Sequence, residues 1–141
     1  QPDRTATMTN ADQCAYEPFA DQIDVNGTFQ ADDIGLLYDP DPWTLAGETV
    51  ADSTNGYLSA TSDAGWGNIP NSGTYTIDAR FCDVYEYAVI SMHIGGGNGD
   101  PDNWAWLMAD GTTGGTWSLD YIAGGNEAGG GLSNIKLLCA G

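Results

Sequence analysis

Apolar and polar side chains alternate most regularly in the second half of the chain, between residues 84 and 108. The even-numbered apolar residues of one extended run share a face at the two-residue period of a strand: Ala88, Ile90, Met92 and Ile94. Residues 95–103 are rich in glycine and contain Pro101, so they cannot continue that strand. An apolar, tryptophan-rich run resumes at residue 104. The pattern predicts a long-looped β-hairpin at the centre of the fold.

Shorter runs of the same kind predict further strands on both sides of this hairpin. They are Ile34–Tyr38, Trp43–Leu45, Tyr57–Thr61, Thr74–Asp78, Thr116–Tyr121 and Leu132–Leu138. Turn-forming residues separate the runs, and no window has a helical period. The sequence therefore predicts an all-β protein, a single antiparallel β-sandwich or jelly roll.

The first 13 residues stand apart from these strands. Thr5, Thr7 and Thr9 alternate with Ala6 and Met8, which is a strand pattern, but no turn signal pairs this segment with a neighbour. It is either a frayed terminus or an extended arm that adds a strand to another subunit. The predicted organisation is an N-terminal arm over residues 1–13 and a sandwich domain over residues 14–141.

Charge limits the classes of partner. Lys and Arg number 3 against 20 Asp and Glu, which gives a net charge of −17. Such a chain is unsuited to nucleic acid or to anionic membrane surfaces, both of which are bound through Lys and Arg. It suits divalent cations and neutral partners such as glycans, or simply a solvated surface. No apolar run reaches the roughly 18–20 residues of a membrane span.

The cysteines and the first residue favour an oxidising, extracellular location. Gln1 is not a start methionine, so removal of a secretion signal is the simplest interpretation. Three cysteines predict one disulfide and one leftover thiol, or a bond to another subunit. Three pairings are open, and we favour Cys82 with Cys139 because both lie near predicted core strands. Asn26 begins a glycosylation pattern, Asn26-Gly27-Thr28.

Calcium is the cofactor that the sequence favours. Asn98, Asp100 and Asp102 have the alternate spacing of the first half of a calcium loop. The sixth position is Asn103 instead of glycine and no glutamate follows at the twelfth, so this is not an EF-hand. Further oxygen clusters are provided by four aspartates: Asp32, Asp33, Asp39 and Asp41. Each cluster alone also fits a solvated turn.

No catalytic constellation is evident. His93 is the single histidine and lies two residues from Ser91 on one strand face. That spacing is about 6.5–7 Å at the backbone, too long for a nucleophile and its base. No CxxC or histidine pair suggests zinc, and the acidic residues lack the alternate spacing of a glycosidase strand. The sequence therefore predicts a protein that is not an enzyme.

The tryptophans after the glycine loop allow two interpretations. Trp104 and Trp106 share one strand face with Met108, whereas Ala105 and Leu107 share the other. If the face with the smaller residues packs inside, the two indoles form a platform for sugar rings or for another subunit. If the indoles pack inside, they belong to the core.

Several short motifs in the second half resemble a known group of proteins. In order they are Ser72–Tyr75, His93–Gly96, Trp104–Leu107, Gly115–Ser118 and Gly131–Ile135. Residues 72–138 thus resemble secreted bacterial exoproteins of the exosortase-sorted (PEP-CTERM) kind, which implies a β-sandwich. His93 stands where a lysine often precedes the glycines, and Asn134 where a histidine often follows the serine. Such sandwiches are also similar to subunits of extracellular fibrils of environmental bacteria, which polymerise by strand donation.

The leading functional hypothesis is a secreted structural subunit that assembles with copies of itself into an extracellular filament. Ala6 and Met8 of the arm would fill a groove in the next subunit, and the arm's backbone would complete its open sheet edge. The alternative is a calcium-assisted carbohydrate-binding, lectin-like module that uses Trp104 or Trp106 beside the Asp100–Asp102 loop.

Overall fold

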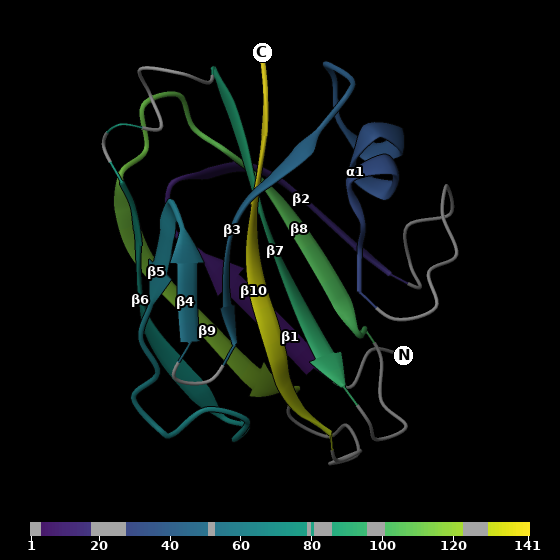
Figure 1. Cartoon of the computed structure of the whole chain (residues 1–141). Helices are drawn as coiled ribbons and strands as arrows, with labels where there is room; N and C mark the ends of the chain where they lie inside the picture. Colours follow the sequence, from purple (N-terminus) through teal and green to yellow (C-terminus); the bar gives the residue numbers. More distant parts are fainter. Residues whose placement is uncertain are drawn as a thin grey trace.

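Two antiparallel sheets pack face to face in the computed structural model (Figure 1). The structure describes residues 4–17, 28–50, 53–78, 80, 86–95, 101–122 and 130–141. In this part of the chain, every strand pairs antiparallel with its neighbours. The predicted all-β sandwich is confirmed.

The smaller sheet has four strands in the order β1-β9-β6-β5, and the larger has six in the order β2-β8-β7-β10-β3-β4. The strand bounds are β1 Arg4–Met8, β2 Ala11–Glu17, β3 Thr44–Val50, β4 Ser53–Gly56, β5 Leu58–Ala60, β6 Asn71–Ile77, β7 Tyr87–Gly95, β8 Asn103–Met108, β9 Gly114–Tyr121 and β10 Gly131–Ala140.

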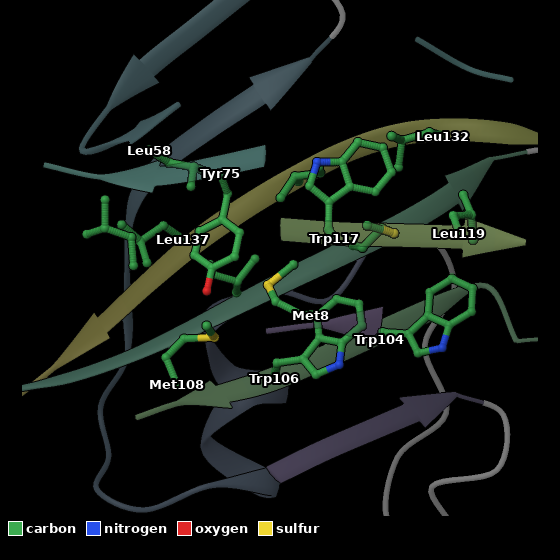
Figure 2. Close-up of a cluster of buried hydrophobic side chains, with 14 of the residues drawn as sticks. Met8, Leu58, Tyr75, Trp104, Trp106, Met108, Trp117, Leu119, Leu132 and Leu137 are labelled. Atoms are coloured by element: carbon green, nitrogen blue, oxygen red, sulfur yellow. The ribbon is translucent and has the colours of Figure 1, made fainter. Parts of the chain in front are cut away.

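The predicted central hairpin is present as β7 and β8. Ile90 pairs with Trp106 and Met92 with Trp104, and β10 lies on the other side of β7. These four side chains face the other sheet, where they meet Tyr75, Trp117 and Leu119 in the main core (Figure 2). The alternation of β7 therefore marks its core face correctly.

A close backbone approach fixes the position of Trp117 in this core. The indole Nε1–H of Trp117 donates to the carbonyl oxygen of Thr61 at 3.0 Å. Gly73 lies between them, and a Cβ there would be 1.8 Å from the Thr61 oxygen. Only glycine fits at this point, so the indole hydrogen bond depends on Gly73.

A second, smaller core covers the outer face of the six-stranded sheet. Helix α1 (Ala31–Leu37) and the residues beside it pack on that face. The Tyr38 hydroxyl donates to the Ala105 carbonyl at 2.8 Å, and the Trp43 indole donates to the Tyr38 carbonyl at 3.0 Å. The sheet side of the cluster consists of Val89, Ala105, Leu138 and Ala140.

The strand predicted over Ile34–Tyr38 is wrong, because this segment belongs to α1 and its C-terminal end. The backbone N–H of Gln30 donates to Asp33 Oδ2 at 2.7 Å, which closes the start of the helix. Asp32 and Asp33 also lie in the first turn, where carboxylates interact favourably with the helix dipole. In the described part of the chain α1 is the one helix, and its seven residues are too few to cross a membrane.

Both long edges of the sandwich are closed by chain that passes from one sheet to the other (Figure 1). On one side β1 leads into β2 through Thr9 and Asn10, and on the other β4 leads into β5 through Gly56 and Tyr57. Asn10 has a φ of 63°, and Gly56 has a φ of 70° with the Ala46 carbonyl oxygen 2.2 Å from where a Cβ would lie. Each crossing thus depends on a residue that tolerates the left-handed region.

The sequence predicts an arm over residues 1–13, but the described residues 4–13 of this segment belong to the sandwich. β1 pairs with β9 from Arg4 opposite Tyr121 to Met8 opposite Trp117, and the boundary predicted after residue 13 falls inside β2. The partner strand lies more than 100 positions away in the sequence. No local turn signal could reveal such a pairing.

Candidate functional site: the first strand and its groove

The inward face of β1 is part of the main core. Met8 is 8% exposed and lies among Tyr75, Trp106 and Trp117 (Figure 2). Ala6 packs against the same cluster. The predicted inward direction of Ala6 and Met8 is confirmed. In the described structure, however, they pack into the core of their own chain instead of that of a neighbouring subunit.

The outward face of β1 carries the threonines. Thr5, Thr7 and Thr9 are exposed. Thr7 Oγ1 and Ser118 Oγ share a hydrogen bond, and the backbone N–H of Thr116 donates to Thr9 Oγ1 at 2.9 Å. Cross-strand hydroxyl pairs of this kind add to the backbone pairing with β9.

The turn after β1 is held by three hydrogen bonds. The Tyr75 hydroxyl donates to the Thr9 carbonyl at 2.6 Å, and Asn10 Nδ2 donates to the Gly114 carbonyl at 2.7 Å. The Ala109 N–H donates to the Asn10 carbonyl at 2.8 Å. Burial raises the pKa of Tyr75, so its hydroxyl remains a donor at neutral pH.

The first residue of β1 makes a partly buried ion pair. The Arg4 side chain is fully buried, and its Nη1 donates to Asp102 Oδ1 at 3.1 Å and to the Pro101 carbonyl at 3.3 Å. Arg4 belongs to the four-stranded sheet, whereas Pro101 and Asp102 immediately precede β8 of the other sheet. The pair therefore connects the two sheets at one end of the β1–β2 edge.

A groove runs between β1 and β2. Two adjoining cavities of about 280 and about 310 Å³ share Ala6 and Cys14 in their walls. Trp104 lines the first cavity beside Arg4, and Trp106 lines the second beside Met8. The groove thus leaves space beside β1 on the side that faces β2, while β1 stays paired with β9 along its whole length.

The predicted sugar or subunit platform of Trp104 and Trp106 is wrong. Both side chains are only 3% exposed, and their rings lie nearly parallel with centroids 6.5 Å apart in the core (Figure 2). Ala105 on the opposite face is also buried, under α1. Because both faces of β8 are covered, the size of its side chains does not reveal which face points to the main core.

The predicted disulfide is not present. Cys139 is a buried free thiol whose Sγ lies 3.1 Å from Thr44 Oγ1, and Cys82 lies outside the described residues. Cys14 is also a free thiol. Its position in the groove wall raises its pKa to about 11, so it is a poor nucleophile at neutral pH. Asn26, the predicted glycosylation acceptor, lies outside the described residues.

The candidate calcium ligands are not brought together in the described part of the chain, which contains no group of three or more metal-binding side chains. Asp102 is paired with Arg4, whereas Asn98 and Asp100 lie outside the described residues. The remaining candidates belong to α1 and its surroundings: Asp32 and Asp33 in its first turn, and Asp39 and Asp41 after its end. Calcium binding by the loop of Asp100 stays a prediction.

His93 has a different partner from the one that a catalytic pair needs. Its Nδ1 lies 3.2 Å from Asn103 Oδ1, and the buried Ser91 hydroxyl makes no hydrogen bond. Asn134 lies opposite His93 on β10, so the two residues are cross-strand neighbours. Nδ2 of Asn134 donates to Thr28 Oγ1 at 3.1 Å.

Sequence reasoning missed Arg4 and its partner Asp102 as members of this site. The sequence does indicate the direction of Arg4. It lies two and four residues before Ala6 and Met8, so it shares their inward strand face. The sequence does not reveal its partner, because Arg4 and Asp102 lie 98 positions apart in the chain.

Comparisons with known proteins give this chain no family. No protein-family model, no curated protein and no solved structure matches it. We therefore infer its function from the described residues and from the sequence patterns above.

Proposed function

We propose that this protein is the structural subunit of an extracellular filament, and that copies of the chain are joined by exchange of β1. The observation that carries the proposal is the role of β1 as an edge strand whose inward side chains complete the main core. An extracellular location follows from the resemblance of residues 72–138 to exosortase-sorted exoproteins.

The exchange needs one local change. If the turn at Thr9 and Asn10 opens, β1 leaves its own β9 and extends away from β2. The same strand of a neighbouring copy then fits the vacated position, with Met8 in the core and five residues in register with β9. The pairing and core contacts of β1 itself are reproduced between chains, so the exchanged form gives up only contacts of the opened turn at Thr9 and Asn10.

Charge supports β1 as the connecting element. Copies with a net charge of −17 repel one another, so a contact between them must offset that repulsion locally. Residues 4–9 contain one arginine and no acidic residue, whereas the whole chain has only three basic residues. The strand is therefore a positively charged segment of a strongly acidic protein, and its attraction to another copy is favourable.

Removal of β1 tests the proposal. We expect the full chain to form filaments visible by negative-stain electron microscopy, and a protein of residues 10–141 to remain monomeric. A peptide of residues 4–9 should bind the shortened protein, because β9 and the groove are then open. A peptide of the same composition, with Thr7 and Met8 exchanged, should not bind, since its methionine points to solvent.

Two results would refute strand exchange. One is filament formation by the shortened protein, which would place the contact elsewhere. The other is a full chain that stays monomeric at high concentration after refolding.

Replacement of Asn10 should shift the balance between the closed monomer and the filament. A β-branched residue tolerates φ > 0 poorly, so Asn10→Val should destabilise the closed turn by about 1–2 kcal/mol. Asn10→Gly loses the same side-chain hydrogen bond to Gly114 but keeps the turn conformation accessible. Sedimentation should show roughly tenfold more polymer for the valine variant than for the glycine variant. Equal polymer yields from both variants would exclude this turn as the hinge.

The carbohydrate-binding alternative loses its main support, because the two tryptophans assigned to it are buried. We do not propose it. Calcium binding near Asp100 remains compatible with a filament subunit, and a chelator series on assembled material would test it.

A further inference from the structure

We propose that the Arg4–Asp102 ion pair determines which strand the groove accepts, and so restricts assembly to copies of this chain in one register. The inference rests on the proposed strand exchange, in which Arg4 of one copy meets Asp102 of the next. The strand that the groove binds comes from a second copy of this chain. The groove recognises it by Arg4 and by the apolar side chain of Met8, four residues further on.

The geometry makes the pair selective. The Arg4 side chain is 0% exposed, while that of Asp102 is 40% exposed, so the arginine enters the protein and the aspartate receives it at the surface. Nη1 donates both to Asp102 Oδ1 and to the Pro101 carbonyl. A strand with a neutral residue at this position would leave both acceptors without this donor. A strand with an acidic residue would add repulsion.

The pair also fixes register. Arg4 and Met8 are the two ends of β1 and are both buried, so each must occupy its own site at the same time. A slip by one residue turns both side chains to solvent and brings Thr5 and Thr7 inward. A slip by two residues keeps the parity but moves the guanidinium about 7 Å from Asp102. Only one register therefore satisfies both ends.

The other basic residues do not offer the same contact. Arg80 is an exposed partner of Asp78, with Nη2 2.6 Å from Oδ2, and Lys136 lies on the central strand β10. The Arg4 guanidinium is fully buried, so salt screens its pair with Asp102 less than it screens the exposed pair of Arg80 and Asp78. Arg4 is thus the cation suited to recognition within the sandwich.

Reversal of the two charges tests whether the pair forms between chains. Arg4→Glu and Asp102→Arg should each raise the protein concentration needed for assembly by more than about a hundredfold, since each places two like charges together at a site where the residue 4 side chain is fully buried. An equimolar mixture of the two variants should assemble again into filaments in which they alternate, because each strand then meets an opposite charge. The double variant should assemble alone. Reversal of the exposed pair, with Asp78→Arg and Arg80→Glu together or singly, should change little.

The outcomes separate this inference from the proposed function. If either single variant assembles like the unchanged protein, the pair does not select the strand, and strand exchange itself stands. If the double variant recovers but the mixture does not, the pair acts within one chain, which overturns both. If the unchanged protein does not assemble, the proposed function fails.

A second measurement covers single variants that fail to fold. Peptides of residues 4–9 are added to shortened proteins of residues 10–141, and binding is followed by fluorescence anisotropy. The Arg4→Glu peptide should bind the Asp102→Arg protein in preference to the unchanged one, and the unchanged peptide should show the reverse order. Equal affinities in all four combinations would overturn the selectivity of the pair.

Discussion

Replacement of Met8 by aspartate is expected to detach β1 and abolish assembly. Met8 is almost fully buried between the two sheets, among the aromatic rings of the main core (Figure 2). Transfer of the charged side chain into this site is so unfavourable that the strand should leave it. We expect the free energy of unfolding to fall by about 3 kcal/mol or more, measured by urea denaturation. Filaments should be absent from the same preparation by electron microscopy.

The neighbouring Thr7 supplies a matched control. Thr7→Asp adds the same charge to the same strand, but its side chain points to solvent and loses only a hydroxyl pair with Ser118. This variant should unfold within about 1 kcal/mol of the unchanged protein and should still assemble. If both variants lose stability and assembly to a similar extent, the cause is the negative charge on β1. The insertion of the Met8 side chain into the core would then not be the deciding factor.

Local patterns in the sequence specify the strands well, because a period of two is imposed by the pleat itself. Ile90 and Met92 on β7 and Tyr75 and Ile77 on β6 face the main core as their alternation predicts. The segment before Asp39 shows the limit of this reasoning. In α1 only Ile34 is fully buried, so seven residues do not produce a visible helical period. The helix instead begins with the capping contact between Gln30 and Asp33 and packs Ile34 into the second core.

Long-range pairing is the part of the fold that the sequence does not reveal. β1 pairs with β9 across more than 100 residues, and β2 pairs with β8 across nearly as many. No turn links either pair, so their register is set only in three dimensions. This is why the sequence predicts an arm over residues 1–13, although β1 within that segment completes the sandwich. β1 is an edge strand that completes the core and is joined to β2 through one turn. The proposed strand exchange depends on this combination, because such a strand can leave its own core and enter that of another copy.

Part of the candidate site was predictable on the same grounds. The inward parity of Ala6 and Met8 is confirmed, and the same parity places Arg4 inside. Their use between subunits stays a prediction. The tryptophans of β8 could not be assigned to a side, because Trp104 and Ala105 are both buried and burial on two faces removes the amphipathic signal.

Replacement of Trp106 by alanine is expected to destabilise the fold itself. On an exposed platform the change would leave stability nearly unaltered, whereas a buried indole supports the packing of both sheets. Trp106 contributes to the main core and to the groove wall beside Met8, so we expect a loss of about 3–5 kcal/mol in unfolding free energy. Guanidinium denaturation followed by tryptophan fluorescence and far-ultraviolet circular dichroism measures it.

Tyr16 is the control for this variant, because it also lines the groove but is 38% exposed. Tyr16→Ala should lower the unfolding free energy by less than about 1.5 kcal/mol. Strand exchange adds a further expectation that distinguishes donor from acceptor. The wall of the groove belongs to the receiving copy, so a folded Trp106→Ala protein should donate β1 normally to shortened unchanged protein but should receive the β1 peptide poorly. The Met8→Asp protein should show the opposite: poor donation from its own strand, and normal acceptance of an unchanged β1 peptide.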